Sequence, residues 1–281
     1  MTATAVATVV DLHGPRPFTK WAGGKRQLLP ELHKHVPEKF GRYFEPFFGG
    51  GALFWSLQPK TSTIGDLNVE LTTALKCIKS NVSSLIIMLR SFELSHLKRK
   101  KVFYLELRED IPHRDVEVAA RFITLNRLGF NGLYRVNKSG GFNVPYGKWA
   151  STPKVCDEVN LKACSLALRG ASIVHGDFAH IVMPAQRGDF VYLDCPYWPV
   201  SATADFTSYT KDGFDAADQE RLRDLALKLK RSGVKVLLSN ADMPQVRKLY
   251  KQGFEMRRVE ARRGINSDAT KRGSVNELLI W

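Results

Sequence analysis

The residue pattern with the most specific chemistry is Asp194-Cys195-Pro196-Tyr197, which follows the apolar run 190–193. The exocyclic amino group of a base such as adenine is a poor nucleophile, because its lone pair is delocalised into the ring. Two acceptors aimed at its two N–H bonds would draw the nitrogen toward a tetrahedral geometry, and the Asp194 carboxylate and the Cys195 carbonyl can be that pair. Pro196 would stiffen the turn, and the Tyr197 ring offers a surface on which an extruded base can stack. We interpret these residues as a candidate catalytic turn, with an ordinary strand-ending turn as the alternative.

A second pattern is the glycine-rich segment 45–51, E-P-F-F-G-G-G, after a short strand-like run. Glycines in this position let the backbone approach a ligand closely. A dinucleotide fingerprint would need a glycine where Phe54 stands, and no Lys-Ser/Thr pair follows to make a phosphate-binding P-loop. The acid before the glycines suits a cationic or hydroxyl-rich ligand better than a pyrophosphate. Asp66, which ends the next strand, could accept hydrogen bonds from ribose hydroxyls or act as a helix N-cap.

A third pattern is K-W-A-G-G-K at 20–25. A lysine after a Gly-Gly turn could hold a carboxylate, and Trp21 could cover an adenosine. By composition alone the same six residues could form a surface turn.

The elements that would carry these residues alternate between strands and helices. Strand-like runs lie at 43–47, 62–65, 172–175, 190–193 and 234–238, and 254–259 and 275–281 look like a final strand pair. A helix with Asp215 as its N-cap precedes the fifth run and ends at Gly233. This alternation predicts an α/β fold with a mostly parallel sheet that is covered on both faces.

In sheets of this kind ligands bind at the carboxyl ends of the strands. The polar residues at those ends are Glu45, Asp66, Asp177, Asp194 and Asn240. We therefore expect the candidate turn and the glycine segment to meet at one edge of the sheet.

The middle of the chain breaks this alternation. Residues 116–128 form a largely apolar pattern typical of a buried helix, and 129–142 predict a β-hairpin with basic and aromatic residues at its base. The chain has a net charge of +14, and residues 71–165 carry 16 Lys and Arg against 8 Asp and Glu. An excess of this kind favours nucleic acid as the partner and this segment as the phosphate-tracking surface, with plain solubility as the alternative.

Composition and spacing argue against several classes of protein, namely membrane-spanning, secreted, zinc-binding and disulfide-stabilised ones. No run of about 18 apolar residues could span a membrane, and the first residues lack the features of a signal peptide. The four cysteines form no C-x-x-C pair, so we expect neither a zinc site nor a disulfide framework, but a reducing, cytoplasmic setting.

The motifs K-W-A-G-G-K, E-P-F-x-G-x-G, L-N-R-x-G-x-N-G-L-x-R, G-x-F-N-V-P-Y-G and a D-x-P-Y turn occur in that order. Their order resembles the Dam family of DNA adenine-N6 methyltransferases, the α group of the D12 class. The stretches 201–207, 238–240 and 262–265 also resemble the family, so the resemblance runs from about residue 17 to the end.

The resemblance implies a Rossmann-like class I methyltransferase fold with an inserted helical and β-hairpin target-recognition domain. The catalytic domain would comprise residues 17–70 and 166–281, the target-recognition domain 71–165, and an N-terminal tail 1–16. The implied reaction moves a methyl group from S-adenosylmethionine to N6 of an adenine that has flipped out of duplex DNA, within GATC.

The resemblance also implies roles for individual residues. Lys25 and Trp21 would bind the cofactor, the glycine loop would pass its methionine part, and Asp66 would hold the ribose. Asp177 and Phe178 would lie near its adenine. The full cofactor set is Trp21, Lys25, Phe47, Gly49, Gly51, Asp66, Asp177, Phe178 and Asp194, and the catalytic set is Asp194, Cys195, Pro196 and Tyr197.

The hairpin segment would read the DNA. Arg135 and Leu133 would contact bases, Phe130 would fill the gap left by the flipped adenine, and Lys20 would reach another guanine. Asn137, Asn143 and Lys148 would touch phosphates, and Asn131 and Pro145 complete the DNA-binding set.

One departure from the family matters. The family pattern is D-P-P-Y, and Cys195 stands in place of the first proline. Cysteine keeps the carbonyl that the chemistry needs but loses the fixed φ angle, so the turn would be looser. We predict reduced or normal activity, and a folded Cys195→Pro variant that failed to methylate would contradict this.

The favoured mechanism is direct methyl transfer without a metal. We expect the chain of 281 residues to act as a monomer in the cytoplasm of a bacterial or phage-infected cell. The alternatives are an amino methyltransferase acting on cytosine N4 or RNA, a catalytically silent DNA-binding member of the family, and a nicotinamide-dependent dehydrogenase. The aspartate at 194 argues against cytosine, and the incomplete glycine fingerprint argues against a dehydrogenase.

Overall fold

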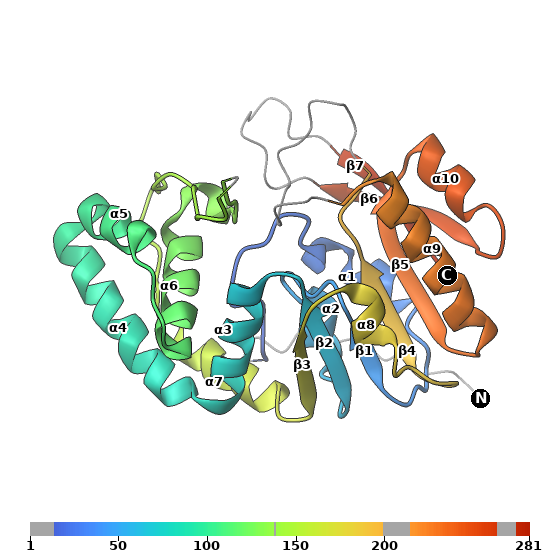
Figure 1. Ribbon diagram of the computed structural model, residues 1–281, viewed down its shortest axis with the longest axis horizontal. Coiled ribbons are helices and arrows are strands. Elements are labelled where there is room, and N and C mark those ends of the chain that lie inside the picture. Colours follow the sequence, from blue (N-terminus) through green and yellow to red (C-terminus); the bar gives the residue numbers. More distant parts are fainter. Residues whose placement is uncertain (1–13, 138, 199–213, 263–273) are drawn as a thin grey trace, which may run out of the picture.

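A seven-stranded sheet forms the centre of the protein in a computed structural model that describes residues 14–137, 139–198, 214–262 and 274–281 (Figure 1). The strands are β1 (Tyr43–Glu45), β2 (Ser62–Asp66), β3 (Ala171–His175), β4 (Phe190–Asp194), β5 (Lys235–Ala241), β6 (Met256–Arg262) and β7 (Ser274–Ile280). Their spatial order is β3-β2-β1-β4-β5-β7-β6. All neighbours pair in parallel except β7, which is antiparallel to both β5 and β6.

This strand order places a switch point between β1 and β4. The chain winds outward from β1 through β2 to β3, then returns to the middle and winds the other way through β4 and β5. Ligands bind at such a point, outside the carboxyl ends of the two strands, because the loops there diverge to opposite faces. The predicted mixed, mostly parallel sheet is therefore confirmed, and its switch point lies between Glu45 and Asp194.

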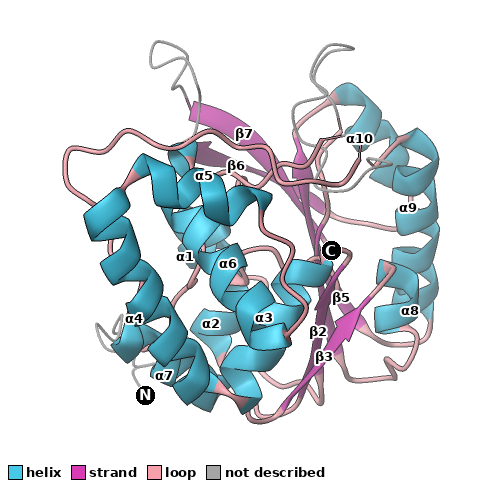
Figure 2. Cartoon of the chain, turned by 60° about the vertical axis from the view of Figure 1, so that its left-hand side comes forward, coloured by secondary structure: helices cyan, strands magenta, loops and turns pink. Residues whose placement is uncertain are grey.

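Helices cover both faces of the sheet, as Figure 2 shows. On one face lie α8 (Phe178–Val182), α9 (Ala216–Arg231) and α10 (Pro244–Tyr250). On the other face lie η1 (Lys25–Leu28), α1 (Leu29–His33), α2 (Ala52–Leu57) and α3 (Val69–Ser80). Buried aromatic and aliphatic residues fill the space between each layer and the sheet, which offsets the entropy of ordering the chain.

The middle of the chain adds a helical layer beyond α3. It contains α4 (Val82–Arg99), α5 (Lys101–Glu109), α6 (Asp115–Leu128), the short turn η2 (Phe130–Gly132) and α7 (Glu158–Ala167). The predicted buried helix is confirmed in α6, where Phe122 and Leu125 are almost fully enclosed. One continuous apolar core joins this layer to the sheet, because α3 packs on both.

The predicted hairpin is present but irregular. Among the described residues, two isolated bridges link its arms, Gly129 with Tyr146 and Val136 with Phe142. The Asn137 side-chain oxygen accepts from the backbone N–H of residues 139 and 141, so a side chain rather than a strand ladder organises the tip. Residue 138 lies outside the described residues, as do 1–13, the stretch 201–207 and residues 263–265.

Several element boundaries differ from the expectations for identifiable reasons. The first strand ends at Glu45 instead of residue 47, because Pro46 has no N–H to continue the ladder. Asp215 is the N-cap of α9 as predicted, and it forms a capping box with Asp218. In the described part of the chain, no helix is long and apolar enough to cross a membrane.

A buried amide ties the N-terminal segment to the middle layer. Asn126, on α6, is fully buried, and its Oδ1 accepts from the Lys20 N–H at 2.8 Å. Its Nδ2 donates to the carbonyls of Lys20 and Gly132, each at 2.9 Å. The K-W-A-G-G-K segment is thereby held against the turn η2, which the sequence placed in a different functional unit.

We expect Asn126→Ala to lower the free energy of unfolding by about 2 kcal/mol, because it removes the partner of one buried and two partly buried main-chain groups. The measurement is equilibrium unfolding in urea. Asn81→Ala is the matched control, since Asn81 is exposed and makes no capping hydrogen bond. Equal losses in the two variants would show that the Asn126 contacts contribute little.

Candidate active site

The predicted site residues converge at the switch point of the sheet. Glu45 ends β1, Asp194 ends β4, and Lys25 begins η1 directly beside them. All three side chains are largely enclosed, with Lys25 only 4% exposed and Glu45 only 2% exposed. The sequence predicted one edge for the two carboxylates and the resemblance placed Lys25 in the cofactor set, and the structure brings Lys25 against Asp194.

An ion pair between Lys25 and Asp194 forms the centre of the site. The Lys25 Nζ lies 2.8 Å from Asp194 Oδ1 and 3.9 Å from Glu277 Oε2. It also donates to the Gly23 carbonyl at 2.6 Å. The Gly-Gly turn thus directs the ammonium toward the end of β4. The carboxylate that Lys25 contacts in the structure is that of Asp194.

Burial and charge act in opposite directions on this pair. Loss of solvent raises the pKa of Asp194 to about 6, although the Lys25 ammonium favours the ionised form. For Lys25, burial alone would lower the pKa, but the carboxylates of Asp194 and Glu277 outweigh it and leave the pKa raised. The carboxylate therefore titrates close to neutral pH while the lysine stays protonated.

Glu277 is a site residue that the sequence patterns missed. It lies on β7, is 8% exposed, and accepts a 2.5 Å hydrogen bond from the Tyr197 hydroxyl. The Lys25 ammonium lies 4.8 Å from the centre of the same tyrosine ring. Tyr197 is consequently held at its hydroxyl and along its face. No local motif marks Glu277, because it reaches the site only through strand pairing.

The turn after β4 is packed rather than loose. The Cys195 side chain is 2% exposed and belongs to the core on the α9 face of the sheet. Its thiol lies 3.5 Å from the Asn240 Nδ2, and burial raises the pKa of this thiol far above its usual value. Packing therefore holds the Cys195 side chain, whereas no ring fixes the backbone φ angle of this residue.

The glycine loop makes room for the protein's own aromatic rings. A Cβ on Gly49 would lie 2.7 Å from the Trp21 ring, and one on Gly51 would lie 2.2 Å from Phe48. Both glycines have positive φ, at +46° and +61°. Trp21 in turn stacks on Tyr134 with ring centres 5.8 Å apart. The Trp21 ring thus packs directly against the backbone of the glycine loop.

Asp66 serves the same loop. Its Oδ2 accepts from the Gly49 N–H at 2.9 Å and its Oδ1 from the Asn68 N–H at 3.0 Å. Burial raises the pKa of Asp66 even though these N–H groups oppose the shift. Asn68, and not Asp66, caps the following helix α3. The half-buried carboxylate thus lies beside the glycine loop, with each oxygen accepting a backbone N–H.

An aromatic cluster flanks the site on the α8 side. The Phe47 ring stacks on Phe178 at 5.2 Å, and the Arg221 guanidinium lies 4.3 Å over the Phe178 ring. Asp177 caps α8 and forms a two-pronged ion pair with Arg221. Phe178 is buried, whereas Phe47 is only half-buried, so Phe47 offers the more accessible ring.

Phe130, Leu133 and Lys20, which the resemblance assigns to the target bases or to the gap left by the flipped adenine, lie close together around the turn η2. Phe130, Asn131 and Leu133 form or follow the turn η2, where Asn131 has a positive φ of 55°. Lys20 arrives from the N-terminal segment, and a Cβ on Gly132 would lie 2.5 Å from its side chain. Through its hydrogen bonds to Lys20 and Gly132, Asn126 holds together two segments that are more than 100 residues apart in the sequence.

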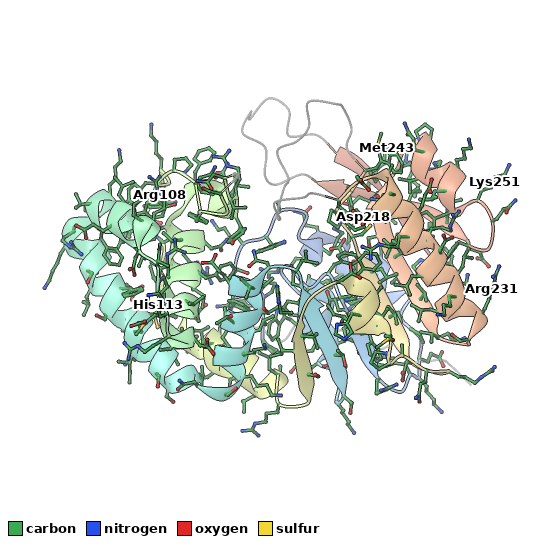
Figure 3. All side chains as sticks on the ribbon, viewed as in Figure 1. Arg108, His113, Asp218, Arg231, Met243 and Lys251 are labelled. Atoms are coloured by element: carbon green, nitrogen blue, oxygen red, sulfur yellow. The ribbon has the colours of Figure 1, made fainter. Side chains whose placement is uncertain are left out.

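The rest of the predicted DNA set lies along the hairpin. Arg135 donates through Nε to Asn143 Oδ1 at 2.7 Å, which fixes the guanidinium beside the arm. The Pro145 carbonyl accepts from Phe130, and Asn137, Pro145 and Lys148 are exposed. A cavity of about 390 Å³ opens between the hairpin and the α5–α6 connection, where Figure 3 labels Arg108.

Within the described ranges, no group of three His, Cys, Asp or Glu side chains could hold a metal ion. His33 contacts Ser56, and His35 stacks on Trp281, so the two histidines point to different neighbours.

Comparison with known proteins gives a consistent result. Residues 21–265 match the profile of the D12 class N6 adenine-specific DNA methyltransferases. The chain is 44% identical over 273 residues to type II methyltransferase M1.LlaDCHI of Lactococcus lactis subsp. cremoris, covering 94% of each chain. It is 41% identical over 285 residues to type II methyltransferase M.MjaIII of Methanocaldococcus jannaschii, covering 94% of this chain and 98% of the relative. It is also 35% identical over 267 residues to a DNA adenine methylase of Vibrio cholerae, covering 94% and 95%.

We expect Glu277→Ala to lower the free energy of unfolding by about 1–3 kcal/mol, because the Tyr197 hydroxyl loses its acceptor. Glu277→Gln keeps an acceptor and should cost less than half as much. Urea unfolding measures both, with the exposed Glu255→Ala as control. A glutamine variant as unstable as the alanine variant would contradict the role of the hydroxyl bond.

Proposed function

Because the chain belongs to the D12 class of N6 adenine-specific DNA methyltransferases, we propose that it transfers the methyl group of S-adenosylmethionine to an adenine flipped out of duplex DNA. We further propose that the target adenine lies within GATC. The observation that carries the proposal is the Asp194-Cys195-Pro196-Tyr197 turn at the switch point of the sheet, beside the glycine loop. The family assignment sets aside the cytosine, RNA and dehydrogenase alternatives.

The residues at this edge fit S-adenosylmethionine, which combines a sulfonium, an amino acid, a ribose and an adenine. Asp194 Oδ1 is buried and, although paired with Lys25, accepts no well-aligned hydrogen bond from the described residues. Trp21, Lys25, Phe47, the glycine loop and Asp66 would hold the cofactor, with Asp177 and Phe178 behind Phe47. When bound, it supplies a methyl group that is already activated by the positive sulfur.

The protein's own contribution is to orient the amino nitrogen. The Asp194 carboxylate and the Cys195 carbonyl would accept its two N–H bonds, which frees the lone pair for attack. The Tyr197 ring, held by Glu277 and Lys25, would stack on the flipped base. Burial of the site excludes water and strengthens each of these interactions.

Lys25 already lies against the carboxylate that we assign to the adenine, as an ion-pair partner without a well-aligned hydrogen bond to Oδ1. Its ammonium lies 2.8 Å from Asp194 Oδ1, which is the distance expected for an amino nitrogen in the same position. Lys25 thereby keeps Asp194 ionised before substrate arrives, and it must move or share the carboxylate when the base enters.

The helical layer would bind the DNA. We propose residues 71–165 as the target-recognition domain, 17–70 and 166–281 as the catalytic domain, and 1–16 as a tail, acting together as a monomer. Arg135, Leu133 and Lys20 would contact bases, and the exposed hairpin residues would contact phosphates. We expect the enzyme to act in the cytoplasm of a bacterial or phage-infected cell, where duplex DNA lies.

We expect Asp194→Ala to reduce methyl transfer by at least 1000-fold while DNA affinity changes little, because only the orientation of the amino group is lost. The measurement is transfer of labelled methyl into DNA, with DNA binding measured in parallel. Asp224→Ala, an exposed carboxylate on α9, is the control. Full activity of the Asp194 variant would remove the basis of the assignment.

The pH dependence should report Asp194. Since its pKa is about 6 and the ionised form is the acceptor, log kcat/KM should fall as the pH drops below about 6. Lys25→Met removes the cation that lowers this pKa, so the acid limb should move to higher pH. The control is Lys34→Met, an exposed lysine paired with Glu31, which should leave the limb in place. An acid limb that does not respond to Lys25→Met would refute the pairing.

The target sequence can be tested in cells that lack adenine methylation. Plasmid from cells expressing the protein should resist a nuclease blocked by methylated GATC and be cut by one that requires it. Plasmid from cells expressing Asp194→Ala should show the opposite pattern. Methylated adenine in digested DNA without protection of GATC would retain the enzyme and change the target.

A further inference from the structure

Two buried amides join the catalytic turn to α9 and β5. Gln219 is 1% exposed, and its Nε2 donates to the Pro196 carbonyl at 2.9 Å. Asn240 is fully buried, and its Nδ2 donates to the Gln219 Oε1 at 3.0 Å. Gln219 follows Asp218, which Figure 3 labels at the end of α9 nearer the middle of the molecule. The turn is thereby tied to the rigid elements on either side of it.

Main-chain groups at both ends determine the direction of these bonds. The Ala241 N–H can only donate, and it donates to Asn240 Oδ1 at 2.8 Å. The Asn240 amide must therefore turn its NH2 toward Gln219, and Gln219 must turn its own NH2 toward Pro196. The carbonyl of Pro196 can only accept, so the chain of bonds has one consistent orientation.

The turn needs such a restraint in this protein. A proline at position 195 would fix φ, but Cys195 leaves that angle free. Pro196 biases the residue before it toward extended backbone angles but does not fix its φ as a proline ring at 195 would. The Cys195 carbonyl, which we assign as the second acceptor of the amino group, receives no hydrogen bond within the described part of the chain. Its direction depends on the backbone of the turn alone.

We propose that Gln219, oriented by Asn240, is a positioning residue for methyl transfer. Its bond to Pro196 anchors the peptide that follows the Cys195 carbonyl and supplies the restraint that a proline ring would give at 195. The inference rests on the proposed function of the turn. It adds two residues that no motif of the sequence assigned to the reaction.

A purely structural role makes a different prediction. If the amides only dock α9 on the sheet, replacing Gln219 lowers stability, and any loss of activity is the same whichever residue stands at 195. If Gln219 restrains the turn, its loss lowers kcat in the presence of Cys195 and matters much less when φ is fixed by a proline ring. The two roles therefore differ in the coupling between positions 219 and 195.

The test compares Gln219→Met in the natural chain and in the Cys195→Pro background. Methionine keeps the volume of glutamine but donates no hydrogen bond. We expect kcat for methyl transfer to fall about tenfold in the natural chain and no more than about twofold in the Cys195→Pro background. The KM values for S-adenosylmethionine and DNA should change little, because the loss concerns orientation in the transition state. Single-turnover transfer of labelled methyl measures the rate, and thermal unfolding is recorded for every variant.

Glu220→Ala, on the exposed side of the same turn of α9, is the control and should leave the rate unchanged. Equal losses from Gln219→Met in both backgrounds, or no loss in either, would overturn the inference. If Gln219→Met does not fold, Gln219→Leu tests the same bond, because leucine is apolar, has a similar volume and donates no hydrogen bond to Pro196. It should show the same dependence on Cys195→Pro, and equal losses would again overturn the inference.

Asp194→Ala separates this inference from the proposed function. Activity of that variant would refute the assigned turn itself. An inactive Asp194→Ala together with a fully active Gln219→Met would refute only the role of Gln219.

Discussion

The buried ion pair between Lys25 and Asp194 is the interaction on which the rest of the site depends. A carboxylate at the end of a central strand loses most of its solvent, and this loss raises its pKa to about 6. The Lys25 ammonium opposes that shift, and Glu277 and the Gly23 carbonyl hold the ammonium in place. The chemistry that we propose for the turn needs an ionised acceptor, and the buried cation favours that ionised form.

The segment 20–25 that supplies this cation also joins the two halves of the molecule. Asn126 binds its backbone at Lys20, and the Trp21 ring lies between the glycine loop and Tyr134 of the hairpin arm. At the other end of the segment, five residues after Lys20, Lys25 contacts Asp194. The segment 20–25 therefore connects the turn η2 with the Asp194 carboxylate, although the two are separated in sequence. The helical layer shares one apolar core with the sheet, which limits how far the two can move apart.

Local patterns predicted the elements whose signals are local. Periodicity and capping residues predicted the alternation of strands and helices along the chain, the Asp215 cap and the buried helix α6. All three are present. The strand pair at the end of the chain is present with shifted limits, as β6 and β7. The hairpin differs most, because the Asn137 side chain takes the backbone N–H groups that a ladder would use. Local competition of that kind depends on exact geometry that periodicity does not contain.

The sequence by itself determined the type of chemistry and the edge at which it occurs. The motifs in their fixed order resemble the adenine-N6 methyltransferases, and the alternation of strands and helices predicted the mostly parallel sheet, because both signals lie in short contiguous segments. Only the tertiary structure decided which partners these residues have. Glu277, Gln219 and Asn240 reach the turn from two strands and a helix further along the chain. The physical reason is that contacts made by strand order and helix docking join residues that no spacing in the sequence relates.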